Sequence, residues 1–121
     1  MTPEELEEFH SDMVGRLAKD PEAILNELTP QDCDCLHAVI GICGEAGELL
    51  DAIKKVAIYR KPIDLENVIE ELGDIEFYLQ LLRDALGIHR TETLLANMEK
   101  LNKRYGKSYS DQAAQDRADK T

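Results

Sequence analysis

The chain has 121 residues, which is enough for one domain and too few for two. Its 25 Asp and Glu side chains outnumber 14 Lys and Arg, so the formal net charge is −11. That charge opposes binding to DNA, RNA or an anionic membrane, and the acidic N-terminus and short apolar runs argue against a signal peptide or a membrane span. We therefore expect a cytoplasmic protein with no nucleic-acid or membrane partner.

The three cysteines lie close together at Cys33, Cys35 and Cys43. An odd, clustered set is a poor disulfide framework, which indicates reduced thiols. Cys33, Cys35 and His37 form a C-x-C-x-H pattern that could suggest zinc. Side chains two residues apart on a helix point in different directions, so this spacing argues against a zinc site.

The first predicted helix runs from Pro3 to about Lys19. Thr2 is in position to cap it, Pro3 suits the first helical position, and acidic residues fill the first turn. Its apolar residues recur every three or four positions, as expected for one buried stripe: Leu6, Phe9, Met13 and Leu17. Asp20 and Pro21 end this helix, and the stretch up to Leu28 is compatible with a short extra helix.

The second predicted helix follows the cap and proline at Thr29 and Pro30 and reaches about Ile58. Residues 59–63 indicate a loop, after which Asp64 is in position to cap a third helix.

The third predicted helix ends near Leu86, because Gly87 is a typical helix stop. A fourth extends from Glu92 to about Tyr105 and ends at Gly106. No convincing strand is present. The pattern predicts an all-α four- to five-helix bundle in residues 1–106, followed by a polar tail, residues 107–121.

Two pairs of acidic residues occur within the second and third helices. Glu45 and Glu48 lie in the segment GEAGE, and Glu71 and Asp74 lie in EELGD. Residues three apart on a helix lie about 60° apart around its axis, so each pair can present two carboxylates to one side. Both pairs border apolar stripes, and antiparallel packing of the two helices would bring them face to face. Four carboxylates so close together repel one another unless cations neutralise them.

The type of ligand indicates the metal. All four positions offer hard oxygen donors and no histidine belongs to the motif, unlike the Glu-x-x-His of di-iron bundles. The pattern therefore favours Mg²⁺, with Mn²⁺ as a possible substitute.

Three glycines, Gly41, Gly44 and Gly47, fall every third residue within the second helix, where each costs about 1 kcal/mol relative to alanine. They indicate either room for a ligand beside the helix or close packing of another helix.

The segments GEAGELLDAIKK (44–55) and EELGDIEFYL (70–79) resemble the MazG-like family of all-α nucleoside triphosphate pyrophosphohydrolases, whose signature is E-x-x-E, a spacer and E-x-x-D. Here 22 residues separate Glu48 from Glu71. The resemblance covers roughly residues 37–105. It implies magnesium-dependent hydrolysis of a nucleoside or deoxynucleoside triphosphate to the monophosphate and pyrophosphate, and assembly into homodimers or homotetramers.

The resemblance also implies roles for individual residues. Glu45, Glu48, Glu71 and Asp74 would hold the metal, and Glu48 or Glu70 would be the general base. Substrate contacts would come from the following residues: His37, Lys54, Tyr78, Asn97, Lys100 and Arg104. Arg104, Tyr105 and Gly106 match the family's R-[YF]-P ending except that glycine replaces the proline. Lys54 also has an ordinary structural interpretation as part of a basic helix end, Tyr78 as a packed aromatic, and His37 as a surface or packing histidine.

Two other functions remain compatible with the sequence. One is hydrolysis of dUTP or of another nucleotide by the same fold. The other is a helical interaction module that binds metal without catalysis, and it predicts stabilisation by metal without nucleotide turnover.

Overall fold

The computed structural model describes residues 1–106 and 110–117, and within them every regular element is a helix. The predicted all-α fold is therefore confirmed. The helices are α1 (Pro3–Leu17), α2 (Pro21–Glu27), α3 (Pro30–Ala57), α4 (Leu65–Leu86), α5 (Arg90–Tyr105) and α6 (Asp111–Asp116). The predicted short extra helix is α2, and α5 begins two residues before its predicted start. The sequence-predicted tail contains α6, while residues 107–109 and 118–121 of that tail lie outside the described residues.

Local capping chemistry sets the ends of the two longest helices. The side chain of Thr29 accepts a hydrogen bond from the Asp32 amide (3.1 Å), and the carboxylate of Asp32 accepts one from the Thr29 amide (3.0 Å). Asp64 accepts from the amide of Asn67 (3.1 Å) at the start of α4. Gly87 ends α4 in the left-handed conformation (φ 67°), which glycine adopts without steric cost.

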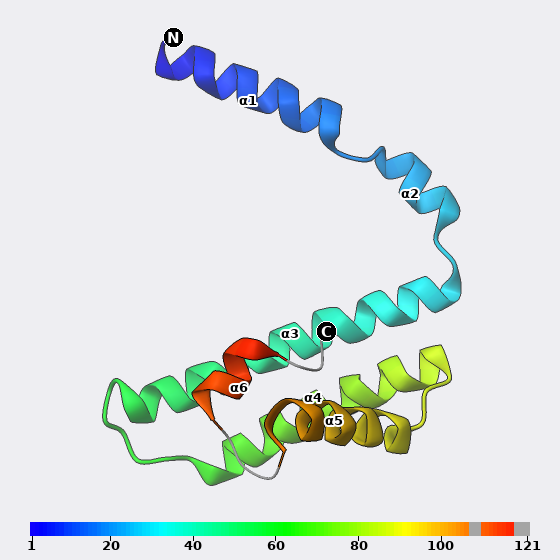
Figure 1. Ribbon diagram of the computed structural model, residues 1–121. Helices are drawn as coiled ribbons and strands as arrows, with labels where there is room; N and C mark the ends of the chain where they lie inside the picture. Colours follow the sequence, from blue (N-terminus) through cyan, green and yellow to red (C-terminus); the bar gives the residue numbers. More distant parts are fainter. Residues whose placement is uncertain (107–109, 118–121) are drawn as a thin grey trace.

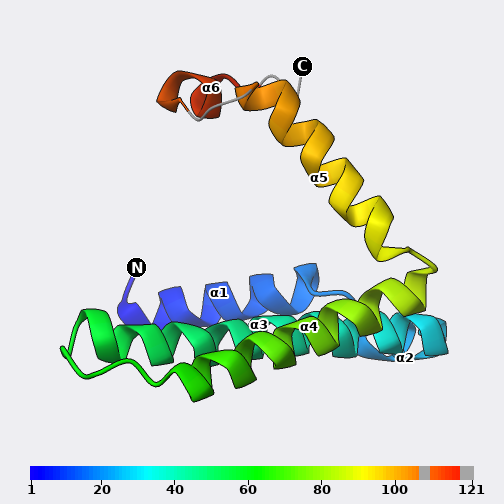
Figure 2. The same cartoon turned by 90° about the horizontal axis from the view of Figure 1, so that it is seen from below.

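Helices α3 and α4 form an antiparallel hairpin, which is the main packed unit of the chain (Figures 1 and 2). At its open end the side-chain amide of Gln31 donates to the carbonyl oxygen of Ala85 (2.8 Å). The least exposed residues recur at spacings of three and four, which marks the face that each helix turns to the other. We call these positions the seam; they are Ala38, Gly41, Ile42, Glu45, Leu49, Ala52 and Val56 of α3 with Val68, Glu71, Ile75, Tyr78, Leu79 and Leu82 of α4.

Gly41 allows the closest approach of the two helices. A Cβ atom at this position would collide with the ring of Tyr78, whereas a Cβ at Gly44 or Gly47 would meet nothing within 4 Å. Of the two interpretations of these glycines, close packing therefore applies to Gly41. Open space lies beside Gly44 and Gly47.

The remaining helices extend away from the hairpin. Figure 1 shows α1 and α2 swinging out from the start of α3, and Figure 2 shows α5 diverging from the end of α4 and contacting α6. Among the described residues only Ala38 and Arg83 are buried, and most of the large apolar side chains are exposed. The described helices of a single chain thus share no common core.

Candidate metal centre

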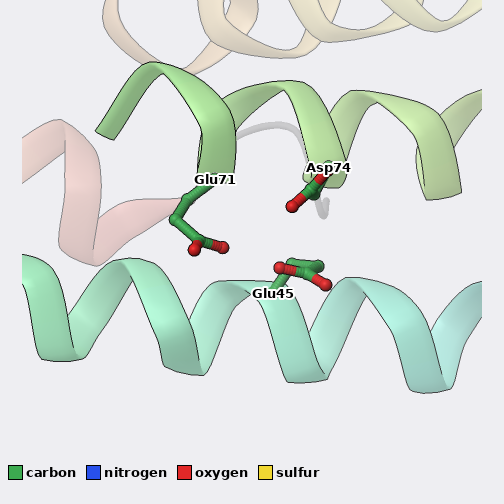
Figure 3. A group of neighbouring side chains, drawn as sticks. All are labelled: Glu45, Glu71 and Asp74. Atoms are coloured by element: carbon green, nitrogen blue, oxygen red, sulfur yellow. The ribbon is translucent and has the colours of Figure 1, made fainter. Parts of the chain in front are cut away.

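Three carboxylates from the two hairpin helices meet at the middle of the seam. Glu45 comes from α3, and Glu71 and Asp74 come from α4; one oxygen of each lies within 4.8 Å of the others. Figure 3 shows the three side chains directed into the space between facing turns. Glu45 and Glu71 are half-buried, while Asp74 is exposed.

The seam register explains why these acids meet. Glu45 lies three residues after Ile42 and four before Leu49, so it takes a position that apolar residues fill elsewhere in the seam. Glu71 holds the equivalent place between Val68 and Ile75. Because α3 and α4 pack antiparallel, the same packing that brings aliphatic side chains together brings these two carboxylates together.

The crowding of negative charge changes the chemistry of Glu71. Its pKa rises from 4.5 to about 7, first because its protonated carboxyl hydrogen-bonds Glu45, then because of burial, and then because Glu45, Asp74 and Glu48 are negative. Its second oxygen, Oε2, is buried and has no hydrogen-bond partner. A buried carboxylate oxygen without a partner is costly, so the site favours a proton or a cation.

The donor set fits a hard divalent cation. Every member of the cluster is a carboxylate, and oxygen-only ligands are those that Mg²⁺ and Mn²⁺ prefer. Two or three protein carboxylates leave coordination positions for water and for substrate phosphates, which is the usual arrangement around Mg²⁺. The residues present therefore suit the metal that the sequence motif predicts.

The other two predicted carboxylates lie outside this cluster. Glu48 is exposed one turn beyond Glu45, and its charge contributes to the raised pKa of Glu71. Glu70 is exposed on α4 next to Glu71. Their roles as metal ligand and general base remain predictions.

Two of the predicted substrate residues lie together on the hairpin. The ring of His37 meets the ring of Tyr78 edge-on, with centroids 5.8 Å apart, and Phe77 meets Tyr78 on another side at 5.1 Å. Tyr78 is half-buried over Gly41, so packing explains its position in this chain. Lys54 lies near the end of α3, with its Nζ 5.6 Å from the ring centre of Tyr59.

The other predicted substrate residues lie on α5, which diverges from the hairpin (Figure 2). Asn97 and Lys100 are exposed, and the guanidinium of Arg104 lies 5.8 Å from the ring centre of Tyr105. The structure therefore gathers Glu45, Glu71 and Asp74, and it leaves the α5 cations on a separate arm.

Sequence reasoning did not foresee the unequal placement of the two acids in GEAGE. Both border an apolar stripe, but only Glu45 lies in the seam. The spacing of the apolar residues around it, Ile42 before and Leu49 after, is the signal that distinguishes it from Glu48. Sequence reasoning also left open the contact between Gly41 and Tyr78, which only the packing of α4 reveals.

Two antiparallel helices with a cluster of carboxylates between them are typical of the class of all-helical proteins that bind divalent cations. The chain belongs to one family of that class, because the family model of the MazG nucleotide pyrophosphohydrolase domain matches residues 34–108, more than half of its length. The match includes the whole of the seam and all three clustered carboxylates. It identifies the domain as a nucleotide pyrophosphohydrolase domain, a hydrolase type that the sequence motif had indicated.

Comparisons with curated proteins and with solved structures returned no significant match. In the part of the chain that the structure describes, no helix has both the length and the apolar character needed to cross a membrane.

Proposed function

We propose that this protein is a magnesium-dependent pyrophosphohydrolase of nucleoside or deoxynucleoside triphosphates. Water and the triphosphate would yield the nucleoside monophosphate and pyrophosphate. The observation that carries the proposal is the convergence of Glu45, Glu71 and Asp74 across the seam of a MazG domain. We further propose a cytoplasmic protein with a single domain in residues 1–106, followed by a polar tail.

Glu45, Glu71 and Asp74 would hold the magnesium ions, joined by Glu48 from the next turn of α3. Mn²⁺ would substitute, because it accepts the same oxygen ligands. When bound, the metal neutralises phosphate charge and increases the acidity of water at neutral pH. Glu71 would lose its proton on binding the metal, because its raised pKa comes from the hydrogen bond to Glu45, from burial and from negative neighbours that the cation would neutralise.

The chain's other residues would bind the substrate and move the proton. Glu48 or Glu70, as an exposed carboxylate beside the cluster, accepts the proton that the attacking water releases. The water oxygen forms a new bond to phosphorus as the bridging phosphoanhydride bond breaks, and the leaving oxygen carries away the electron pair. Lys54, Lys100 and Arg104 pair with phosphate oxygens. Asn97 donates to the nucleotide, and His37 and Tyr78 provide an aromatic surface for the base.

The decisive measurement is pyrophosphate release from each common NTP and dNTP, including dUTP, with magnesium present. Glu71→Gln keeps the size of the side chain and removes the ligand charge, so turnover should fall at least about a hundredfold. Glu76→Gln, an exposed acid on the same helix and outside the cluster, serves as the matched control and should retain turnover. Helix content is monitored for both variants.

The outcomes separate the candidate functions. Equal turnover by Glu71→Gln and the wild type would refute the proposed site. A preference for dUTP alone would identify a dUTP-specific hydrolase. Thermal stabilisation by magnesium without turnover of any nucleotide would identify the non-catalytic module.

We also propose that the protein assembles as a homodimer or homotetramer. Its single chain exposes 9947 Å² of surface, whereas a compact monomer of 13.6 kDa exposes about 6,600 Å². The excess exceeds the ~800 Å² that each partner buries in a standard interface. A second copy of the chain would bury this excess surface.

A further inference from the structure

Helix α1 carries an apolar stripe that is exposed along its whole length. Leu6, Phe9, Met13 and Leu17 recur every three or four residues and are 47–74% exposed. In Figure 1 the helix lies well away from the α3–α4 hairpin. Five acidic residues and a single basic one, Arg16, cover the rest of its surface. An isolated helix of 15 residues is marginal in water, so its stripe needs a partner surface.

Helix α5 is the second arm, and it has a matching stripe. Leu94, Met98 and Leu101 recur at helical spacing, with Leu95 beside them, and they are 39–66% exposed. The helix has 16 residues against 15 in α1, so both arms are about 22–24 Å long. Four basic residues outnumber two acidic ones on α5, which makes its charge opposite to that of α1.

The distribution of charge along the arms indicates their relative direction. All five acids of α1 lie at residues 4–12, towards its N-terminus. Three of the four bases of α5, Lys100, Lys103 and Arg104, lie towards its C-terminus. Antiparallel packing of the two stripes brings these oppositely charged halves together. Parallel packing would place the acids of α1 beside the half of α5 that contains Glu92 and only one base, Arg90.

A second copy of the chain is the partner that the exposed area requires. The excess surface of about 3,400 Å² per chain is larger than one pair of short helices can bury within a single molecule. The hairpin itself also presents exposed apolar residues such as Leu50 (70%) and Ile69 (67%) away from the seam. An arm that reaches a second copy covers its own stripe and joins two hairpins at once.

We propose that α1 of one copy packs antiparallel against α5 of a second copy, so that the arms are exchanged between subunits. This inference rests on the proposed homo-oligomer and adds the surface that builds it. The stripe of α1 meets the stripe of α5, with Met13 near the Leu94–Met98 turn. Glu5 and Asp12 flank the α1 stripe on one side, and in the antiparallel arrangement they lie on the same side as Arg104, which flanks the α5 stripe.

Cysteine cross-linking between two differently tagged chains tests the exchange. Cys33, Cys35 and Cys43 are first replaced by serine in both chains. One chain then carries Met13→Cys and the other carries Met98→Cys, and the co-expressed pair is oxidised mildly. A covalent product that contains both tags is expected. The matched control replaces Met13→Cys with Gly15→Cys, which lies on the opposite face of α1, and should give no such product.

Charge reversal supplies a second test that needs no cross-link. Glu5→Lys with Asp12→Lys reverses the flank of the α1 stripe, and it should weaken assembly about tenfold at low salt and less at high salt. Glu4→Lys with Glu8→Lys makes the same change of charge on the opposite face and should leave assembly within about twofold. Light scattering over a dilution series measures both variants.

Three outcomes would overturn the arm exchange. The first is a cross-link that forms only when Met13→Cys and Met98→Cys are on the same chain. The second is the absence of a cross-link in a protein that light scattering shows to be oligomeric. The third is that the two charge-reversal variants weaken assembly equally. Nucleotide turnover is measured on the same preparation before oxidation. An exchanged dimer without turnover would refute the proposed function and leave the arm exchange standing, so the two failures are distinguishable.

Discussion

Two glutamates occupy seam positions where an ordinary helical hairpin would have leucine. Burying a carboxylate between helices costs stability unless a proton, a cation or hydrogen-bond donors compensate. Glu71 shows this cost directly, because its Oε2 atom is buried without a partner and its pKa rises to about 7. The folded protein is therefore less stable than it would be with an apolar residue at this position of the seam. Such a loss of stability is expected of a binding site.

The raised pKa of Glu71 predicts how the stability of the metal-free protein depends on pH. The folded state holds a proton on Glu71 up to about pH 7, whereas the unfolded chain releases it near 4.5. The folded state therefore binds more protons within this window, and the contribution of Glu71 to the free energy of unfolding falls as pH rises from about 4.5 to 7. Above about pH 7 this contribution is constant.

Urea denaturation at pH 5 to 8 in a chelator measures this dependence. Other groups titrate in the same range, so the informative quantity is the difference between the wild type and Glu71→Gln. The free energy of unfolding of the wild type, relative to that of Glu71→Gln, should decrease as pH rises. The corresponding difference between the wild type and Glu76→Gln should not depend on pH. A flat difference for Glu71→Gln would contradict the assigned pKa. Saturating magnesium should remove the trend, because the cation replaces the proton.

At the scale of helices, the contact between Gly41 and Tyr78 sets how closely α3 and α4 approach. Gly41→Ala would place a methyl group against the Tyr78 ring and should destabilise the protein by about 1–2 kcal/mol, even after the gain in helix propensity. Gly44→Ala, on the same helix, enters open space and should stabilise it by up to about 1 kcal/mol. Urea denaturation at one fixed protein concentration measures both changes.

A double-mutant cycle checks the cause that we assign to the Gly41 effect. In a Tyr78→Ala background the ring is absent, so Gly41→Ala should become neutral or stabilising. The same loss of stability in both backgrounds would show that the Tyr78 ring is not the obstacle.

The sequence predicts a structural feature well when neighbouring residues in the chain determine it, as they do at helix ends. Thr29, Asp64 and Gly87 mark helix ends through their own hydrogen bonds or backbone conformation, and the predicted bounds agree closely with the structure. The start of α5 is two residues earlier than predicted, because His89 is its N-cap. Local patterns also placed both acidic motifs on facing helices.

Local sequence patterns did not predict the features that depend on packing between residues far apart in the chain. Sequence reasoning did not choose between Glu45 and Glu48, because only the packing of α3 against α4 shows that the Ile42 and Leu49 spacing marks the seam. An amphipathic stripe likewise shows that a helix has an apolar face but not which surface covers it. Helix α1 is the clearest case, since its apolar stripe was predicted to be buried and is exposed in the structure. The substrate roles of Asn97, Lys100 and Arg104 stay predictions for the same reason.

At the scale of the whole molecule, the described part of a single chain has almost no core of its own. Ala38 is the only buried apolar residue among those described, and a domain of this size needs far more buried area to offset the entropy of folding. Folding and assembly should therefore be one process, as in obligate homodimers that have no stable folded monomer.

Coupled folding and assembly predicts that the melting temperature depends on protein concentration. For a dimer that unfolds to two chains, a hundredfold rise in concentration adds about 2.7 kcal/mol, which corresponds to about 5 °C. Calorimetry from about 1 to 100 µM tests this at one pH and salt concentration. Leu50→Lys places a charge on an exposed apolar site of α3 and should lower the melting temperature most in dilute samples. Asp51→Lys at the adjacent polar site loses only an exposed ion pair with Lys55 (3.3 Å) and should lower it much less. A melting temperature that is independent of concentration, together with a monomer in light scattering, would show that one chain folds alone and would exclude the proposed assembly.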